Sequence, residues 1–314
     1  MPMDKAEASA LRSRYGDALF RDVVPFWMEH GLDREEGGYF TGLDRGGEVI
    51  ETDKSVWFQG RMAWTFSTLY ADFGRAPGHL EAARLGIDFL ERHCFDSDGK
   101  MFFRVTRGGE PLIKRKRYWF SEAFAIIAHA AYARATGDAS HIARAREILA
   151  RIDRFRNEPG LLEPKWDQET RASRGFAEPM ILLAVNQELR KADPARAREY
   201  EARMDGHIAE MLPFFNDGLG CVLEQTGPKG EFQDHFEGRQ LNPGHALEAS
   251  WFLLAEARHR KSAELAKLAL KALDWMWKWG WDEECGGGII YFRDALNKPP
   301  SEYWQDMKFW WPQN

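Results

Sequence analysis

The segment from Gly238 to Leu254, GRQLNPGHALEASWFLL, combines residue types that can move a proton. His245 and Glu248 lie three residues apart, so on a helix their side chains are neighbours on one face. Asn242 and Pro243 are a typical helix start, which puts His245 in the first turn. There the positive end of the helix dipole disfavours the protonated imidazole. A neutral histidine beside a carboxylate is suited to act as a general base. The same residues could instead be only the polar first turn of an otherwise apolar helix.

A second candidate group lies in the stretch KSVWFQGRMAWTFSTLY, which begins at Lys54. Arg61 stands there among aromatic residues on a largely apolar helix pattern. Burying an unpaired guanidinium is costly, so this side chain must meet an anion or line a wet cavity. Two readings stay open: Arg61 stabilises negative charge that develops on an oxygen, or it pairs with a core carboxylate or reaches solvent from a helix end.

Three further stretches carry charged residues in suggestive places. Glu122 in RYWFSEAF and Glu178 in FAEPMILL each open an apolar helix pattern, and both could simply be first-turn acids favoured by the helix dipole. The loop GGEPLIKRKR ends in four basic residues, which either cradle an anion or form a solvated turn. The sequence has no glycine-rich phosphate loop after a strand, no metal-ligand cluster and no serine nucleophile elbow, so we expect no metal site.

These candidates are set in a repeating pattern of helices. Apolar residues at three- and four-residue spacing predict an amphipathic N-terminal helix followed by four pairs of helices. The predicted ranges are 7–29, 56–73 with 79–93, 119–136 with 140–155, 178–190 with 194–211, and 243–258 with 262–279. The start of a further helix is predicted around Tyr303 to Trp311.

Turn-rich segments separate the helix pairs. Each joins acidic and glycine residues to a short aromatic or β-branched run, which is typical of hairpins, and they recur roughly every 60 residues. They begin at Asp33, Asp96, Asn157, Asn216 and Asp282. Helix pairs with one hairpin each predict an α/α ring whose loops wall a funnel. A ring of six pairs needs about twelve helices, so we expect a single domain over residues 1–314 that covers about the first ten helices and is incomplete at its C-terminus.

Composition narrows the class of protein. With 13 Trp and 21 Phe, the chain has the aromatic content for a deep cavity with stacking walls or for a large helical core. The net charge of −6 argues against a nucleic-acid partner. The three cysteines have no tight spacing and read as reduced thiols of a cytoplasmic protein. No apolar run is long enough to span a membrane, so no membrane partner is expected.

Taken together, these segments resemble the N-acylglucosamine 2-epimerase family. The matching stretches are VVPFWMEHGLDREEGGYFTGLDRGGEV, KSVWFQGRMAW, RYWFSEAF, EPMILL, GRQLNPGHALEASWFLL and DMKFWWPQN, and they occur in family order. The resemblance implies an all-α (α/α)6 barrel, or toroid, with short β-hairpins between the helices. It also implies an amino-sugar substrate, a homodimer, and chemistry without a cofactor, with ATP as an allosteric activator that is not consumed.

The resemblance also assigns roles to residues. Family members interconvert N-acyl-D-glucosamine and N-acyl-D-mannosamine by removing and returning a proton at C2 of the open-chain sugar, through an enediolate. By this likeness His245 is one of two acid/base histidines, Glu248 holds it, and Arg61 stabilises the enediolate oxygen. Lys114 and Arg117 resemble the basic positions of a nucleotide loop. Four residues fall in the family's substrate-binding segments: Glu122, Glu178, Lys308 and Trp311.

One part of the family pattern is missing. Family members carry their second histidine in a Phe-His-x-Pro-Arg stretch that follows a WWPQN-like segment, and the present sequence has no such stretch. Losing one acid/base partner typically costs about 10²–10⁴-fold in rate, so we expect this chain by itself to be a poor epimerase. Two alternatives remain: an aldose–ketose isomerase or 2-epimerase of free sugars such as mannose, and a non-catalytic binding protein.

Overall fold

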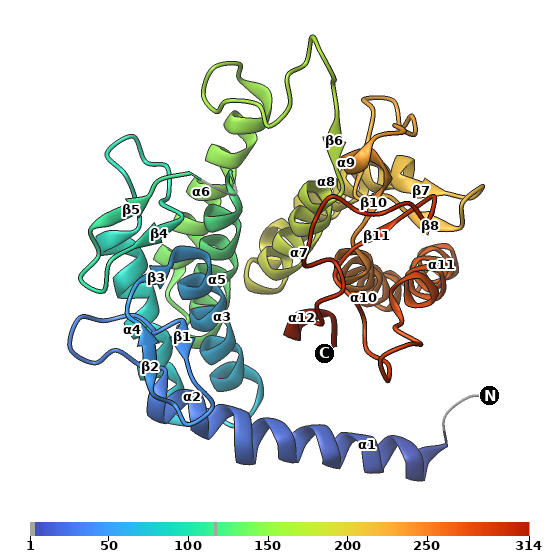
Figure 1. Ribbon diagram of the computed structural model, residues 1–314. Helices are drawn as coiled ribbons and strands as arrows, with labels where there is room; N and C mark the ends of the chain where they lie inside the picture. The colour runs from blue at the N-terminus through green and yellow to red at the C-terminus, as the bar shows by residue number, and fades with distance from the viewer. Residues whose placement is uncertain (1–3, 116–117, 314) are drawn as a thin grey trace. The chain divides into compact units, whose positions relative to one another are not determined.

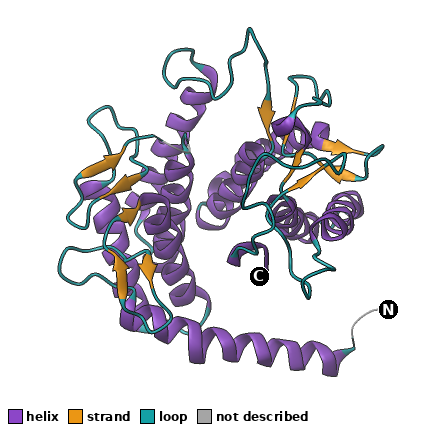
Figure 2. Ribbon diagram, viewed as in Figure 1, coloured by secondary structure: helices purple, strands orange, loops and turns teal. Residues whose placement is uncertain are grey.

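The computed structural model describes residues 4–115 and 118–313 (Figure 1). It is mostly helical, with strands of two or three residues in the connections (Figure 2). Contacts between Cα atoms divide the chain into two compact units. Unit 1 comprises Met1–Leu162 with Lys191–Pro194, and unit 2 comprises Glu163–Arg190 with Ala195–Asn314. The single domain expected over residues 1–314 stays a prediction.

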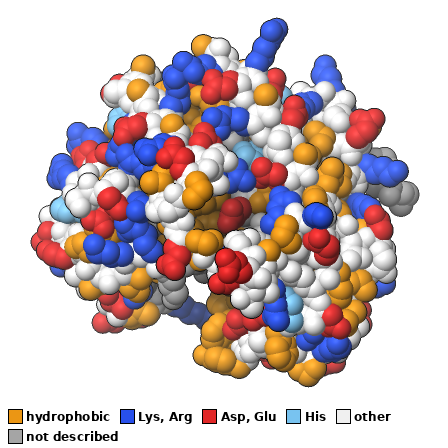
Figure 3. Space-filling model, turned by 90° about the horizontal axis from the view of Figure 1, so that it is seen from above, with side chains coloured by type: hydrophobic (Ala, Val, Ile, Leu, Met, Phe, Trp, Pro, Cys, Tyr) orange, Lys and Arg blue, Asp and Glu red, His pale blue; other side chains and the backbone are white. Residues whose placement is uncertain are grey.

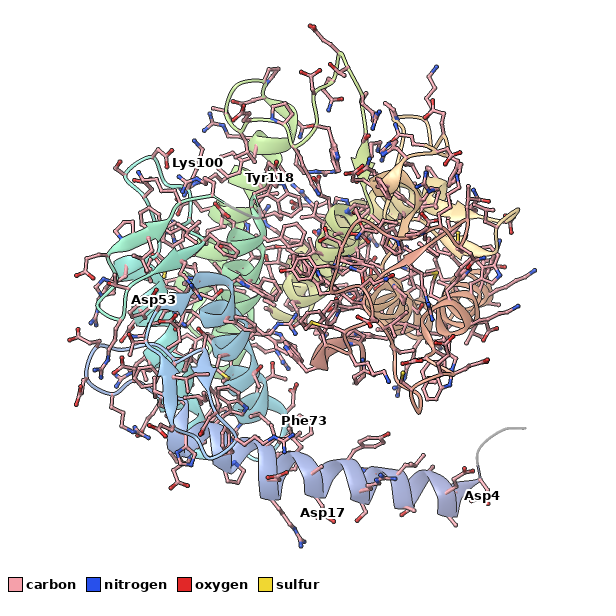
Figure 4. The ribbon with its side chains drawn as sticks, in the orientation of Figure 1. Asp4, Asp17, Asp53, Phe73, Lys100 and Tyr118 are labelled. Atoms are coloured by element: carbon pink, nitrogen blue, oxygen red, sulfur yellow. The ribbon has the colours of Figure 1, made fainter. Side chains whose placement is uncertain are left out.

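A continuous helical run opens unit 1, as predicted for residues 7–29. It consists of α1 (Lys5–Asp17), a π-helical turn (Ala18–Val23) and α2 (Val24–His30). Asp4 caps the run by accepting a 2.8 Å hydrogen bond from the backbone N–H of Glu7, and Asp4 and Asp17 lie at the two ends of α1 (Figure 4). Pro25 follows the π turn, and because its ring crowds the carbonyl four residues earlier, a wider turn is favoured there.

Two helix pairs complete unit 1, as the periodicity predicts. They are α3 (Val56–Asp72) with α4 (Pro77–His93), and α5 (Phe120–Thr136) with α6 (Ala139–Asn157). Nearly every residue of α5 is buried, because its small and apolar side chains let α3 and α6 pack on it. At Gly60 of α3 a Cβ would lie 2.7 Å from the backbone carbonyl of Phe124, so these two helices meet backbone to backbone. The predicted ranges are confirmed to within two residues.

Unit 2 contains the other two helix pairs, apart from the last two residues of their first helix, which belong to unit 1. They are α7 (Ala177–Ala192) with α8 (Ala197–Met211), and α10 (Pro243–Arg260) with α11 (Ala263–Gly280). Short 3-10 turns (Pro194–Arg196 and Leu212–Phe214) flank α8, and a four-residue helix, α9 (Phe236–Arg239), precedes α10. Apolar side chains from all four long helices form the core, including Met180, Met204, Phe252 and Met276.

The helix predicted around Tyr303 to Trp311 is largely wrong. Helix α12 covers only Trp310–Gln313. The stretch before α12 contacts the segment near Ile289. The backbone N–H of Phe292 donates to the carbonyl of Gln305 at 2.9 Å. The side-chain amide of Gln313 bonds both the N–H (2.8 Å) and the carbonyl (2.7 Å) of Ile289. Residues 302–307 instead form turns, with bonds from the N–H of Gln305 to Glu302 (3.2 Å) and from the N–H of Met307 to Trp304 (3.1 Å).

Three of the five predicted hairpins form within their own segments. They pair β1 (Gly42–Leu43) with β2 (Val49–Glu51), β4 (Arg104–Val105) with β5 (Pro111–Ile113), and β7 (Phe215–Asn216) with β8 (Cys221–Val222). The segment from Asn157 has no strand pair of its own among its residues, and Pro159 and Pro164 remove backbone donors there. The segment from Asp282 closes with a single bridge between Trp281 and Ile289.

The remaining strands make a pairing that repeats along the chain. Strands β3 (Lys54–Ser55), β6 (Arg174–Gly175) and β10 (Gln240–Leu241) stand just before helices α3, α7 and α10. Each pairs antiparallel with a strand of the following turn segment: β3 with β4, β6 with β9 (Gln225–Thr226), and β10 with β11 (Arg293–Asp294). The N-terminal ends of these three helices are thereby held in place by the next segment of the chain.

A buried ion pair holds the loops of unit 1. Lys54 is completely buried, and its Nζ donates to Asp33 Oδ2 (2.9 Å) and to the carbonyls of Gly37 (2.6 Å) and Arg107 (2.8 Å). Arg107 Nε also donates to Asp33 at 2.8 Å. Burial by itself would raise the pKa of Asp33, but the bonds from Arg107 and Lys54 overcome it and hold that pKa well below its usual range.

On the face shown in Figure 3, basic and acidic side chains lie interspersed. Ion pairs elsewhere among the described residues include Arg134 with Asp72 at 2.6 Å and Arg154 with Glu158 at 2.9 Å. Across residues 4–115 and 118–313, no helix has both the length and the apolar character that crossing a membrane requires. Within the same ranges, no group of histidine, cysteine and acidic side chains is arranged to hold a metal ion. Cys94 and Cys221 are buried thiols, and Cys285 is an exposed one.

Candidate active site

The Asn-Pro-Gly-His segment opens α10 as the sequence predicts. Asn242 is the N-cap: its Oδ1 accepts from the backbone N–H of His245 at 3.2 Å. Pro243 begins the first turn and packs on the end of α11, where a Cβ on Gly280 would lie 2.6 Å from its Cβ. His245 therefore stands in the first turn of a helix whose start is fixed from both sides.

The imidazole of His245 meets a carboxylate from another part of the chain. Its Nδ1 lies 2.9 Å and 3.0 Å from the two carboxylate oxygens of Glu224. The side-chain nitrogen of Asn242 lies 3.1 Å from the same Nδ1. The His245 and Glu224 side chains are 24% and 21% exposed, so the pair is shielded from bulk water yet reachable from it.

Sequence reasoning missed Glu224. It lies 21 residues before His245 in the fourth turn segment, and no spacing rule joins a residue there to a helix start. Its position depends on strand pairing: its backbone N–H donates to Gln240 at 3.2 Å, and its carbonyl accepts from Phe176 at 3.0 Å. Only the register of those bonds brings the carboxylate to His245.

Glu248 is the carboxylate that the sequence assigned to His245. It follows one turn later on α10, so the predicted spacing is present. The bond that the structure gives to Nδ1 comes from Glu224. That Glu248 also holds His245 stays a prediction.

Trp311, predicted to bind substrate, lies beside His245 in unit 2. The two rings are 6.1 Å apart between centroids and tilted by 48°. A Cβ on Gly244 would lie 2.9 Å from Trp311 Cζ2 and 2.8 Å from Pro312 Cγ, so α12 rests on the start of α10. Tyr291 meets the edge of the indole at 5.3 Å and 87°. An aromatic face next to an acid/base group is suited to a sugar ring, because the C–H faces of sugars pack on aromatic rings.

The other predicted substrate residues of unit 2 have different settings. Glu178 stands half-buried in the first turn of α7, two residues after Phe176, whose N–H bonds Glu224. Lys308 lies against the Asp282 turn: its Nζ is 2.9 Å from Asp282 Oδ2 and 3.1 Å from the carbonyl of Cys285. The bond from Lys308 lowers the pKa of Asp282. Whether either residue touches substrate stays a prediction.

In unit 1, Arg61 lies on α3 among the aromatic side chains that the sequence indicated. Its guanidinium carbon is 5.0 Å from the ring centroid of Phe124 and 5.8 Å from that of Trp57. Stacking of this kind favours a cation at a half-buried site. Its role toward an enediolate oxygen stays a prediction.

Glu122 is buried in the first turn of α5. Its side chain accepts a 2.8 Å bond from the backbone N–H of Met101, and the residue is 1% exposed. Burial raises the pKa of Glu122 to about 7, against the opposing effect of the Met101 bond. Its predicted contact with substrate is untested.

The loop predicted to bind a nucleotide pairs with its own acidic neighbours. Lys114 Nζ lies 3.0 Å from Asp96 Oδ2, and Arg115 lies 3.4 Å from both Asp96 and Asp98. Arg117, the other predicted basic residue of this loop, lies outside the described residues. The assignment of Lys114 and Arg117 to a nucleotide stays a prediction.

Comparison with solved structures concerns the fold. The chain is similar to cellobiose 2-epimerase from Bacillus thermoamylovorans, with a TM-score of 0.77, 18% identity, and coverage of 91% of this chain and 76% of that one. It is also similar to a D-mannose isomerase, with a TM-score of 0.75, 16% identity, and coverage of 91% and 75%. These matches confirm the predicted fold class, the (α/α)6 type with short hairpins.

Sequence comparison concerns the family. The chain is 38% identical over 321 residues to N-acylglucosamine 2-epimerase of Bos taurus, covering 100% of this chain and 75% of that protein. The protein of the same name from Homo sapiens is 37% identical, with coverage of 100% and 74%. Cellobiose 2-epimerase of Bacteroides fragilis is 25% identical over 262 residues, with coverage of 79% and 66%. A family model described as N-acylglucosamine 2-epimerase matches residues 38–314. The chain belongs to the N-acylglucosamine 2-epimerase family, a family of sugar 2-epimerases.

Proposed function

We propose that this protein interconverts N-acyl-D-glucosamine and N-acyl-D-mannosamine by moving the proton at C2 of the open-chain sugar. The observation that carries the proposal is the Glu224–His245 pair at the start of α10, with Nδ1 and Oε1 2.9 Å apart. It stands in a chain 38% identical to a bovine protein named N-acylglucosamine 2-epimerase. A histidine ordered by a carboxylate is the arrangement that general-base catalysis needs.

In the proposed mechanism, His245 takes the proton from C2. The electron pair of the C2–H bond forms a C1–C2 double bond, and negative charge passes to the C1 oxygen. Arg61 stabilises that oxygen, since a cation placed where charge develops lowers the barrier. Return of a proton to the opposite face of C2 inverts the centre, which requires a second proton carrier; the family resemblance assigns that role to a second histidine.

The remaining roles follow the same proposal. Trp311 packs against the carbon chain of the sugar, and Glu248, Glu122, Glu178 and Lys308 bind or orient hydroxyl and amide groups. The aldehyde at C1 already acidifies the C2 proton, so the chemistry needs no metal or organic cofactor. ATP acts as an allosteric ligand at Lys114 and Arg117, where it competes with Asp96 for Lys114. The working state is a homodimer.

Solvent exchange at C2 tests the proposal on the 314-residue chain itself. Proton removal and return on one face exchanges the C2 proton with solvent even without inversion. N-acetylglucosamine and N-acetylmannosamine are incubated separately in D2O, and deuterium at C2 is followed by NMR. We expect exchange with at least one of the two sugars, and a loss of about 10²-fold or more in His245→Asn.

A matched control is available in unit 2 at a histidine that is similarly exposed, with its side chain 18% accessible. His235 also has a carboxylate on its Nδ1, Glu237 at 3.0 Å, but it caps the short helix α9. His235→Asn is expected to exchange the C2 proton at the wild-type rate. Absence of exchange by the wild-type chain with both sugars contradicts the proposed function.

A second candidate is a 2-epimerase of free sugars. It is favoured by the similarity to relatives named cellobiose 2-epimerase, one of which, from Eubacterium cellulosolvens, is 32% identical over 148 residues. The same exchange assay with cellobiose and mannose separates the two, because faster exchange on those sugars than on the N-acetyl sugars favours this candidate. An aldose–ketose isomerase would instead carry the proton to C1 and yield a ketose. A non-catalytic binding protein would bind sugar without exchange.

A further inference from the structure

We propose that Glu224 is the positioning residue of the acid/base histidine. It holds the proton of His245 on Nδ1, so that Nε2 is the nitrogen that exchanges a proton with C2 of the sugar. The inference rests on the proposed function of His245 and adds a residue to it. The position of Glu224 beside His245 depends on the pairing of the strands, and no pattern in the sequence indicates it.

The contacts at Nδ1 decide between two tautomers. A neutral imidazole carries either a proton or a lone pair on Nδ1, so this atom makes one strong bond at a time. Glu224 offers two carboxylate oxygens at 2.9 Å and 3.0 Å, which require a proton on Nδ1. The amide nitrogen of Asn242, at 3.1 Å, would require a lone pair there. A bond to a charged acceptor is roughly twice as strong as a neutral one, so the carboxylate determines the tautomer.

Glu224 cannot easily leave this position, because its backbone is held on both sides. Its N–H donates to Gln240, in the strand that leads into α10, and its carbonyl accepts from Phe176, just before α7. The next residue, Gln225, is engaged by other groups: its amide accepts from Trp166 at 3.1 Å and donates to Ser173 at 3.1 Å. Because both neighbouring elements fix the backbone of Glu224, its carboxylate is already in place before substrate binds. Little conformational entropy of this loop is therefore lost on binding.

The carboxylate also acts on the charge of His245. When Nε2 takes a proton from C2, the imidazole becomes positive, and the N-terminal end of α10 opposes that charge. Glu224 offsets this opposition, since a carboxylate in hydrogen-bond contact favours the protonated ring. Glu224 therefore makes His245 a stronger base than the helix start alone would allow.

The test compares Glu224→Gln with Glu224→Asp in the C2 exchange assay. The glutamine keeps the size but removes the charge, and its amide can present a donor to Nδ1 and so favour the other tautomer. We expect Glu224→Gln to lower kcat by about 10²-fold or more, with KM changed by less than about threefold, because orientation and charge are lost while sugar contacts remain. The acidic limb of the rate profile moves to lower pH, since the base is weaker. Glu224→Asp recovers part of the rate.

Glu237→Gln is the matched control. It removes the carboxylate that lies 3.0 Å from Nδ1 of His235, another histidine of the same unit, and is expected to leave kcat, KM and the pH profile unchanged. Thermal unfolding of each variant shows whether it is folded. A folded Glu224→Gln with wild-type kcat and an unshifted pH profile overturns the inference.

A measurement on the wild-type chain needs no variant. The ¹⁵N chemical shifts of His245 distinguish the protonated ring nitrogen from the bare one. We expect the neutral ring to carry its proton on Nδ1, and a proton on Nε2 overturns the inference even if Glu224→Gln does not fold. Failure of the proposed function is recognised separately, as a wild-type chain that does not exchange the C2 proton of any sugar while His245 keeps the Nδ1–H tautomer.

Discussion

The indole of Trp311 lies directly on Gly244, the residue before the candidate base. A Cβ built on Gly244 would meet Trp311 Cζ2 at 2.9 Å and Pro312 Cγ at 2.8 Å. Gly244 lies within an ordinary helical turn, so its backbone conformation does not call for glycine. The glycine of the Asn-Pro-Gly-His segment is therefore required for close packing. It lets an aromatic side chain from the end of the sequence reach the first turn of α10.

Gly244→Ala should therefore displace α12 from α10. We expect a loss of about 1–3 kcal/mol in the free energy of unfolding, the usual cost of overpacking, together with slower C2 exchange because Trp311 moves from His245. Denaturant unfolding and the exchange assay measure the two effects. In Gly206→Ala, on α8, the new methyl group meets nothing within 4 Å and should stabilise the helix by about 1 kcal/mol. Equal stability of the two variants contradicts the packing role.

Glu122 makes the stability of unit 1 fall as pH rises. Its pKa is raised to about 7 by burial, whereas a glutamate in the unfolded chain titrates near 4.3. The folded state then binds the extra proton, so stability is fully present below about 4.3 and is lost as pH rises through about 7. Glu122→Gln stays neutral and should gain stability relative to wild type between pH 5 and 8, as urea unfolding would show. Glu81→Gln, at an exposed position, should not gain stability over this range. Parallel curves of stability against pH for wild type and Glu122→Gln would contradict the raised pKa of Glu122.

A histidine pair in unit 1, the buried His129 and the partly buried His141, gives the opposite pH dependence. His129 Nδ1 lies 3.0 Å from His141 Nδ1, an arrangement that holds one proton between the two nitrogens, and His129 Nε2 lies 2.9 Å from Glu91. Burial lowers the pKa of His141, and the nearby His129 lowers it further, while Asp138, Glu91 and Asp88 oppose the shift. Below about pH 6.5 the unfolded chain binds a proton on this histidine that the folded chain does not bind. The free energy of unfolding therefore falls by up to about 1.4 kcal/mol for each pH unit of acidification.

Replacing His141 checks this prediction. In His141→Asn the loss of stability between pH 7 and 5 should shrink relative to wild type, measured by urea unfolding at each pH. A second loss of stability, below about pH 4.5, should remain, because Glu91 has a pKa of about 2 in the folded chain. Burial would raise the pKa of Glu91, but the bonds from His129 and Arg144 lower it. His259→Asn, at a half-exposed position, is the control. An unchanged slope in His141→Asn rules the pair out as the source.

Glu256 of α10 holds α7 through a buried ion pair. It is completely buried, and its carboxylate takes both terminal nitrogens of Arg190, at 2.6 Å and 2.8 Å. Glu256→Gln removes the buried carboxylate and leaves Arg190 with the more distant Glu201, at 3.7 Å, so we expect a loss of up to about 3–5 kcal/mol in the free energy of unfolding. Glu199→Gln, which breaks the exposed pair with Arg196, should cost less than about 1 kcal/mol. If the two losses are similar, the buried pair is not a main contact between α7 and α10.

Local rules predicted much of this fold. The start of α10 at Asn242 and Pro243 was readable because a cap depends on residues within one turn of each other. The four helix pairs were readable because apolar periodicity repeats over each helix. The same reasoning failed around Tyr303 to Trp311, where an aromatic-rich stretch resembles a helix but forms turns instead, and the carbonyl of Gln305 accepts from the distant Phe292. Composition alone does not distinguish a helix from a loop packed against its neighbours.

By itself, the sequence determined the family, the helix pairs and the position of His245 in a first turn, because each depends on residues close together in the chain. Only the tertiary structure decided which carboxylate meets Nδ1. Glu224 reaches His245 through bonds of its backbone to Phe176 and Gln240, and the next strand pairs Gly175 with Gln225. The register between distant segments follows from the packing of whole helices beneath them. No spacing in the sequence encodes that register, so the Glu224–His245 pair appears only once the chain is folded.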